Sequence, residues 1–283
     1  MCCCSALHLK LRSRTRVGSE VELTAAWHPK GTAIVICDMW DHHWCLAAER
    51  RVQSLAPYIN KLVEEARSRG VFIIHAPSGV VTSPNSIYPG TAARLRAEQA
   101  PRADPPHPLG QHYNLDAGRG EPNLPIDPVG DSCNCGRPCP GGLVGVPPWT
   151  RQIADIAIDD ADAITDDGQQ VWNLLTQKRI ANVILCGVHL NRCVLGQPFG
   201  IRQMLRVGKT VALVRDLTDT LYHPDHPDRP PEGPTDHYEG TCRVVAHVEK
   251  YLCPTFTSND ITGGDAFRFQ EDTWRGPQVC PAD

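Results

Sequence analysis

The sequence predicts an α/β fold in three layers, with helices on both faces of a mainly parallel sheet. Short apolar, β-branched runs recur along the chain and alternate with amphipathic helical stretches, which is the pattern of βαβ units. The chain has 283 residues, a length that a single α/β domain with loop insertions accommodates. Right-handed βαβ connections make such a sheet parallel and cover both of its faces.

The first part of the core is expected to contain two strands joined by one helix. Residues 1–30 are polar and predict an N-terminal arm or an edge hairpin. The apolar run 32–37 predicts a buried strand, and the apolar stripe over 52–69 predicts a helix that Gly70 ends. The run 71–74 predicts the second strand.

The second part of the core continues the alternation of strands and helices. Its expected strands are 162–165, 182–188 and 210–216, and its expected helices are 169–179, 193–206 and 241–252. Successive strands of this kind pack side by side, so the chain returns repeatedly to one sheet.

Two insertions rich in Pro and Gly interrupt this core. Residues 77–148 contain only a short predicted helix near 91–99, and residues 223–240 precede the last helix. So long a stretch without periodicity is typically a lid or an interface arm, or else disordered. The sequence therefore predicts one domain over residues 31–260 and a C-terminal tail over residues 261–283.

A cysteine stands at the start of the helix predicted after strand 182–188. Asn191 is expected to be the N-cap, which leaves Cys193 in the first turn. Unpaired backbone N–H groups and the positive end of the helix dipole favour the thiolate, which is the reactive form. Cys193 is therefore a candidate nucleophile, and the alternative is a cysteine buried for packing.

The first strand ends directly in Asp38. Ligands of open α/β sheets bind beyond the carboxyl ends of the strands, so Asp38 and the residues after Val188 should meet at one edge. A carboxylate beside a cysteine can take its proton. Residues expected near this edge are candidates for a substrate pocket: Trp40, His43, Trp44, His75, Asn191 and Asp166.

These motifs resemble the isochorismatase-like cysteine hydrolases, the superfamily that includes nicotinamidases and N-carbamoylsarcosine amidohydrolase. The resemblance rests on the strand AIVICD (33–38), the element GV-x-x-N-x-CV (187–194) and the strand TVALVRD (210–216). The order of elements agrees from about residue 31 to 216, and again over residues 237–251. The resemblance implies the predicted fold, and it implies a hydrolase.

The resemblance also assigns roles to residues of this chain. It implies that Asp38 is the general base and that Cys193 forms a thioester with an amide or related carbonyl. It implies a cis peptide bond between Val188 and His189. The backbone N–H groups of His189 and Cys193 would then form the oxyanion hole.

The family's third catalytic residue, a lysine, is missing. It would follow the run 162–165, yet the chain has no lysine between Lys61 and Lys178. Its position falls near Asp166 or Asp167, where a carboxylate opposes a thiolate unless it is protonated or bound to a cation. The alternatives for the missing positive charge are Arg151, His43 and His75, and the sequence does not choose among them.

Two clusters of potential metal ligands occur elsewhere in the chain. They are Asp41, His42, His43 and Cys45 beside the first strand, and Asp131, Cys133, Cys135 and Cys139 in a C-x-C-x3-C loop. Neither has the paired C-x2-C spacing of structural zinc sites, and nothing matches the metal element of nicotinamidases. There is also no Gly-rich phosphate fingerprint. The sequence predicts no bound metal and no cofactor.

Charge and composition limit the partners. The chain has 28 basic and 32 acidic residues, which gives no bias toward nucleic acid or acidic membranes. It has no segment typical of a secretory signal or of a membrane span, so a soluble protein is expected, with the cytoplasm favoured. The expected partners are a small-molecule substrate and further copies of the chain, because homo-oligomers are common in the superfamily it resembles.

The leading hypothesis is a cysteine hydrolase that cleaves a C–N bond of a small amide or carbamoyl compound. One alternative is a catalytically silent relative that binds a small ligand or serves assembly, which the missing lysine favours. The other is a metal-assisted hydrolase in which Asp38, Asp41, Asp166 or nearby histidines hold an ion.

Overall fold

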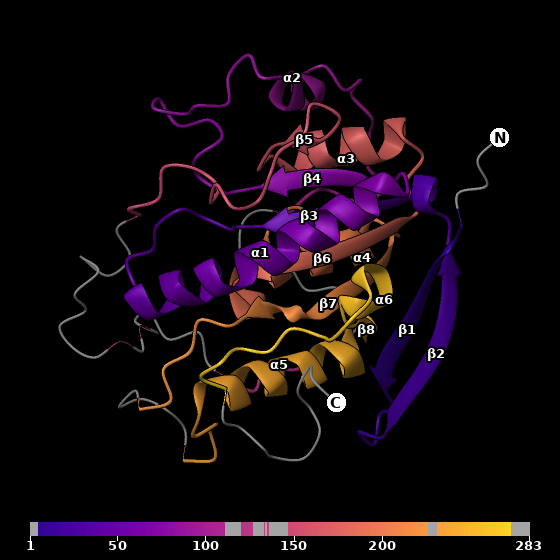
Figure 1. Cartoon of the computed structure of the whole chain (residues 1–283). Coiled ribbons are helices and arrows are strands. Elements are labelled where there is room, and N and C mark those ends of the chain that lie inside the picture. The colour runs from indigo at the N-terminus through magenta and orange to yellow at the C-terminus, as the bar shows by residue number, and fades with distance from the viewer. Residues whose placement is uncertain are drawn as a thin grey trace.

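The computed structural model describes residues 5–110, 120–126, 133, 135, 147–225 and 231–272. They form an eight-stranded sheet in the order β2-β1-β8-β7-β6-β3-β4-β5 (Figure 1). The strands from β8 to β5 are parallel to one another, whereas β1 is antiparallel to both of its neighbours. The predicted fold class, α/β with a mainly parallel sheet, is confirmed.

The strands are β1 (Leu7–Arg14), β2 (Glu20–Trp27), β3 (Thr32–Cys37), β4 (Phe72–Ala76), β5 (Ala163–Ile164), β6 (Asn182–Val188), β7 (Thr210–Asp219) and β8 (Thr255–Phe256). The α-helices are α1 (Leu46–Ser68), α2 (Ala92–Glu98), α3 (Gly168–Gln177), α4 (Ile201–Arg206), α5 (His237–Tyr251) and α6 (Asn259–Thr262). Two short turns of other helix types, η1 (Pro29–Gly31) and η2 (Leu190–Val194), complete the described elements.

The sheet is buried on both faces, which is why its central strands are continuously apolar. Ile34 and Ile36 of β3 pack on one face with α1 and α6. Val35 and Cys37 alternate with them and pack on the other face with α3, α4 and α5. Burying one such aliphatic side chain contributes about 1.5–3 kcal/mol, so β3 anchors both layers.

The helix predicted over residues 193–206 is interrupted. The chain forms the π-helical turn η2 after His189, and α4 begins only at Ile201. Pro198 has no N–H to continue a helix and disfavours helical geometry in the residue before it. Asn191 is therefore inside the turn rather than at its N-cap, which is a correction to the prediction from sequence.

The N-terminal arm is a hairpin, β1–β2, at the end of the sheet (Figure 1). It joins the core through the pairing of Arg12 with Thr255 of β8. The buried Arg12 guanidinium also lies 2.8 Å from a carboxylate oxygen of Glu249 in α5. Part of the predicted C-terminal tail packs too, because Phe267 and Phe269 are buried against the α1 face.

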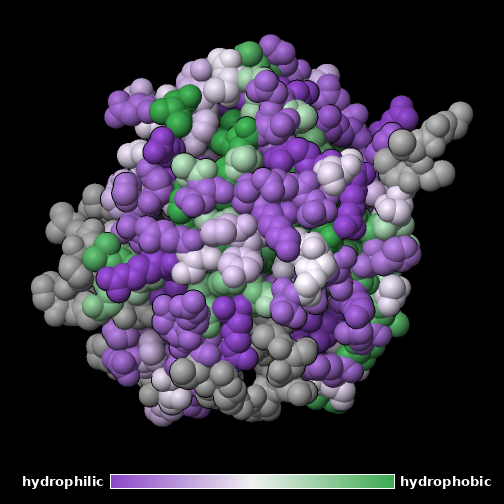
Figure 2. Space-filling view, viewed as in Figure 1, coloured by the Kyte–Doolittle hydropathy of each residue, from purple (hydrophilic) through white to green (hydrophobic). Residues whose placement is uncertain are grey.

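The surface seen in Figure 2 is mostly hydrophilic, with small and separate apolar spots. Among the described residues, no helix combines the length and apolarity needed to cross a membrane.

Candidate active site

The site begins where β3 and β6 end side by side. Gly187 pairs with Cys37, the residue before Asp38. Gly187 has φ +99°, and a Cβ atom there would lie 2.1 Å from the Cys37 carbonyl oxygen. Only glycine permits this approach, because it has no Cβ atom and tolerates positive φ. The close packing brings Asp38 to the turn that carries Cys193.

Asp38 is fully buried, with an exposed fraction of 0%. Its backbone has φ +50°, a left-handed conformation that Asp adopts more readily than most residues. Its Oδ1 accepts a hydrogen bond of 2.6 Å from the backbone N–H of Ser78. The Cys193 thiol also hydrogen bonds to this carboxylate.

Burial raises the pKa of Asp38 to about 6. Hydrogen bonds from Cys193, Ser78 and Gln197 act in the opposite direction, and these donors are all neutral. Asp38 is therefore mostly ionised at neutral pH and yet basic enough to accept a proton. This is the range in which a carboxylate works as a general base.

The turn that carries Cys193 starts at a cis peptide bond between Val188 and His189. The carbonyl oxygen of His189 accepts hydrogen bonds from the N–H groups of Arg192 (2.9 Å) and Val194 (3.2 Å). The Cys193 side chain is nearly buried, at 3% exposed. The two N–H groups expected to form the oxyanion hole, those of His189 and Cys193, belong to this one turn.

Ser78 and Gln197 complete the surroundings of Asp38, and neither was predicted from the sequence. The Gln197 side-chain amide donates to Ser78 Oγ at 2.7 Å, and its backbone N–H donates to the carbonyl oxygen of Cys193 at 3.0 Å. Trp40 Nε1 donates to the carbonyl oxygen of Ser78 at 3.0 Å. Ser78 follows the end of β4, just as Asp38 follows the end of β3. Its position beyond the carboxyl end of a parallel strand would therefore have made it a candidate site residue too.

Aromatic rings lie next to this network. Trp40 stacks on Trp149, with ring centroids 4.1 Å apart and an interplanar angle of 9°. His43 lies between Trp40, Trp44 and Trp149, with centroid distances of 6.2, 4.8 and 5.7 Å. The structure thus brings together Trp40, His43 and Trp44, and it adds Trp149.

His43 does not supply the missing positive charge. Burial, together with the nearby charge of Arg51, lowers its pKa to about 4. Its Nε2 lies 3.3 Å from Nε2 of His189, and burial also lowers the pKa of His189 well below the usual value. Both rings are therefore neutral at neutral pH.

His75 lies on the opposite face of the sheet from Cys193, which corrects its assignment to the pocket. Its neighbours Ile74 and Ala76 share the core of Cys193, and successive side chains of a strand alternate between faces. His75 instead lies 3.0 Å from both Gln152 Oε1 and Asp162 Oδ2, so it is a buried structural residue.

Asn191, Asp166 and Arg151 each have hydrogen-bond or ion-pair partners of their own. Asn191 exchanges two hydrogen bonds with the backbone of Leu221, of 2.9 and 3.0 Å, and so fixes the turn to the chain after β7. Asp166, near the position expected for the lysine, accepts a 2.8 Å hydrogen bond from the N–H of Gly79. Arg151 is 51% exposed at its side chain, and its Nε lies 3.9 Å from Asp41.

A second buried carboxylate lies at the end of β7, where Asp219 pairs with Val188. Arg51 Nε donates to it at 2.7 Å, and His237 Nε2 lies 2.8 Å from its other oxygen. Burial by itself raises the pKa of Asp219, but the charges of Arg51 and His237 outweigh burial and hold it below the usual value. Asp219 is a stable anion.

The first cluster of potential metal ligands, Asp41, His42, His43 and Cys45, does not converge as a group. Asp41 is occupied by the N–H and hydroxyl groups of Thr150, at 2.8 and 2.5 Å. Asp131 and Cys139 lie outside the described residues. Among the described residues, the only group of three potential ligands that converge consists of Cys45, Cys133 and Cys135.

Comparisons with known proteins give matches at the level of structure. No family model and no curated protein matches the sequence. The chain is similar to a solved cysteine hydrolase from Pseudomonas syringae pv. phaseolicola, at 14% identity and a TM-score of 0.49, over 83% of this chain and 92% of the other. It is also similar to an isochorismatase from Pseudomonas putida, at 12% identity and a TM-score of 0.44, over 82% and 91%.

A third structure, an isochorismatase family protein from Burkholderia thailandensis, has 15% identity and a TM-score of 0.36, over 67% of this chain and 79% of the other. At these identities the three likenesses are likenesses of fold.

Proposed function

We propose that this protein is a cysteine hydrolase that cleaves a C–N bond of a small amide or carbamoyl compound through a thioester on Cys193. The observation that carries the proposal is the buried Asp38 carboxylate, with a pKa of about 6, hydrogen bonded to the Cys193 thiol. A base matched to neutral pH beside a thiol is the arrangement that activates a cysteine nucleophile.

The reaction takes two steps at this pair. Asp38 accepts the thiol proton while Cys193 Sγ attacks the carbonyl carbon, which forms a C–S bond and an oxyanion. The oxyanion collapses, the C–N bond breaks, and the leaving nitrogen takes the proton from Asp38. Water then attacks the thioester with Asp38 again as base, which releases the acid and restores the thiol.

Neutral donors take the place of the lysine in this mechanism. Ser78 and Gln197 hold the Asp38 carboxylate in position but add no charge, so its pKa stays raised. The N–H groups of His189 and Cys193 are the proposed donors to the oxyanion. Such a site relies on a strong base rather than on a nearby cation to generate the thiolate.

Turnover of small amides and carbamoyl compounds tests this proposal, with intact-mass detection of the acyl-enzyme. Hydrolysis should be accompanied by an adduct that maps to Cys193 and is absent in Cys193→Ser. Cys253→Ser, which alters another buried cysteine, should hydrolyse like the wild type. Hydrolysis that persists in Cys193→Ser would contradict the covalent mechanism.

A catalytically silent, ligand-binding protein is the second candidate. Asp166 favours it, because it lies near the position of the family's lysine and accepts from a backbone N–H. This candidate predicts that small amides bind, as seen in a shifted melting temperature, without an adduct on Cys193 and without product.

A further inference from the structure

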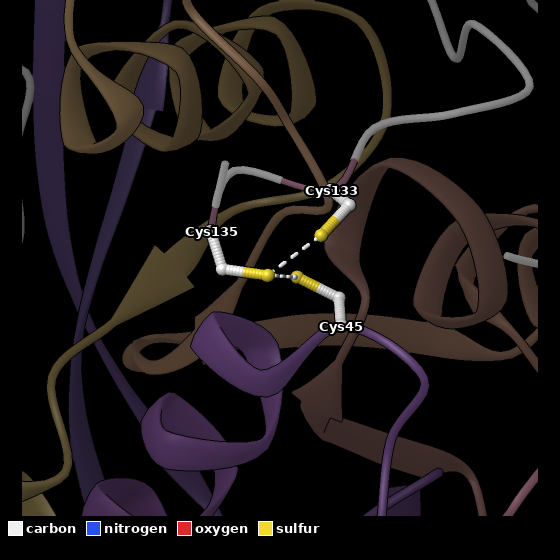
Figure 3. A group of neighbouring side chains, drawn as sticks. All are labelled: Cys45, Cys133 and Cys135. Atoms are coloured by element: carbon white, nitrogen blue, oxygen red, sulfur yellow. Dashed lines mark hydrogen bonds between the residues drawn. The ribbon is translucent and has the colours of Figure 1, made fainter. Parts of the chain in front are cut away.

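A cysteine cluster joins two segments that are far apart in the sequence. Cys45 precedes α1, whereas Cys133 and Cys135 belong to the long insertion, and their three sulfur atoms face one another (Figure 3). Cys135 Sγ lies 2.9 Å from Cys133 Sγ and 4.0 Å from Cys45 Sγ. All three atoms lie within 4.8 Å of one another.

Two of the three cysteines are shielded from solvent, and Cys135 is partly exposed. Cys45 and Cys133 are buried, and Trp44, Ala48 and Leu221 pack around them. Buried apolar surroundings keep water and competing ligands away from a metal. They also strengthen the attraction between thiolates and a cation.

The cluster lies at the N-terminal end of a long helix. Cys45 is the N-cap residue of α1, a helix of 23 residues. The three sulfur atoms therefore connect the beginning of this helix to residues 133 and 135 of the insertion.

We propose that Cys45, Cys133 and Cys135 bind a thiophilic divalent cation, with Zn²⁺ as the representative ion. Zn–S bonds are about 2.3 Å long, so sulfur atoms in a tetrahedral site lie about 3.8 Å apart. The Cys45–Cys135 spacing of 4.0 Å already suits this geometry, and Cys133 has to move by about 1 Å. A disulfide, by contrast, would use two of the sulfurs and leave the third out.

The ion is a structural clamp rather than a reactant. Three thiols lose their protons to solvent as three Zn–S bonds form, so binding weakens as the pH falls. The clamp fixes residues 133 and 135 of the insertion to the start of α1. Trp44 and Trp149 pack on the same cluster and also line the site at His43, so the ion holds this wall in place.

Zinc binding to the full-length, reduced protein tests the proposal directly. The metal-free protein should take up about one Zn²⁺ per chain in competition with a chromogenic chelator, as a single site of three thiolates requires. Co²⁺ in its place should give a thiolate-to-cobalt charge-transfer band. Zn²⁺ should also protect these three cysteines, but not Cys253, from alkylation in peptide mapping.

Single serine variants assign the site to its ligands. Cys45→Ser, Cys133→Ser and Cys135→Ser should each lower the affinity for Zn²⁺ by at least tenfold and abolish the cobalt band, whereas Cys253→Ser should leave both unchanged. Where a variant fails to fold, the protection experiment on the wild type decides instead. Unchanged alkylation with Zn²⁺, binding that survives Cys45→Ser, or a disulfide between two of these cysteines in the reduced protein would overturn the proposal.

Discussion

Two buried carboxylates at the same edge of the sheet have opposite properties. Asp38 ends β3 and Asp219 ends β7, and each has an exposed fraction of 0%. Asp219 contacts the cation Arg51 and His237, and its pKa is lowered. Asp38 contacts only neutral donors among its main partners, and its pKa is raised to about 6.

The contrast shows that the neighbours of a carboxylate, and not burial alone, decide its role. A carboxylate paired with a buried guanidinium is held as an anion and contributes to structure. A carboxylate buried among neutral donors retains its affinity for a proton. At this edge Asp219, paired with Arg51, fixes the chain beside His189. Asp38, surrounded by neutral donors, provides the base for Cys193.

Replacing the base should have the largest effect. Asp38→Asn keeps the shape of the side chain and tolerates the left-handed φ of +50°. Because Asn cannot accept the thiol proton, we expect kcat/KM for amide hydrolysis to fall by about 10²- to 10⁴-fold. Initial-rate kinetics measure this, and a loss below threefold would exclude Asp38 as the general base.

Breaking the ion pair between Arg51 and Asp219 should reduce stability rather than activity. Arg51→Met leaves the buried charge of Asp219 uncompensated, so the free energy of unfolding should fall by about 3–5 kcal/mol. Arg151→Met is the matched control, because this exposed arginine pairs loosely with Asp41 and should cost less than about 1 kcal/mol. Urea denaturation compares the two variants, and equal losses would refute the assigned difference.

The two carboxylates should also depend on pH in opposite directions. The native pKa of Asp38 is raised from 3.8 to about 6, so the native state binds its proton more tightly than the unfolded state. The contribution of Asp38 to the free energy of unfolding is most favourable below about pH 4 and is lost as the pH rises through about 6. The free energy of unfolding changes by about 3 kcal/mol between these limits. Asp38→Asn should therefore stabilise the protein at pH 7.5 but not at pH 4.

Asp219 provides the opposite case. Its native pKa is lowered, so its contribution is present above the ordinary pKa of 3.8 and is lost as the pH falls toward the native value. Asp219→Asn should destabilise the protein at pH 7.5. Thermal melts of both variants at pH 4 and pH 7.5 measure the change in melting temperature relative to the wild type. If both variants raise it, or both lower it, at pH 7.5, the comparison is contradicted.

The smallest expected effect concerns a neutral donor. Gln197→Leu removes a hydrogen-bond donor that lowers the pKa of Asp38. The ascending limb of the pH–rate profile should shift to higher pH, and activity at pH 6 should fall by less than about tenfold while activity at pH 8 changes little. A uniform loss at all pH values would indicate a disturbed turn instead.

Sequence predicted the elements whose signals are local. Strands 32–37 and 182–188 match β3 and β6, because continuous β-branched runs are typical of buried parallel strands. Because ligands of open α/β sheets bind beyond the carboxyl ends of the strands, the sequence also predicted that Asp38 lies near the turn of Cys193. The interrupted helix was missed, although Pro198 is a local signal against a continuous helix.

Other features depend on contacts between distant segments. Side chains of β4 alternate between the two faces of the sheet, so the register of this strand decides on which face His75 lies. The sequence around a single histidine does not give this register. Gln197 and Ser78 are neutral residues in different loops, and only folding places them at Asp38. The cysteine cluster takes Cys45 from one sequence cluster and Cys133 and Cys135 from the other, so neither sequence cluster has the spacing of a metal site by itself.

The most direct measurement is the rate of alkylation of Cys193 against pH, mapped peptide by peptide, in the wild type and in Asp38→Asn. An activated nucleophile should label quickly to about one or two pH units below the ordinary thiol value of about 8.5, and Asp38→Asn should remove this advantage. Slow labelling with an ordinary midpoint that Asp38→Asn leaves unchanged would contradict the pairing of base and nucleophile.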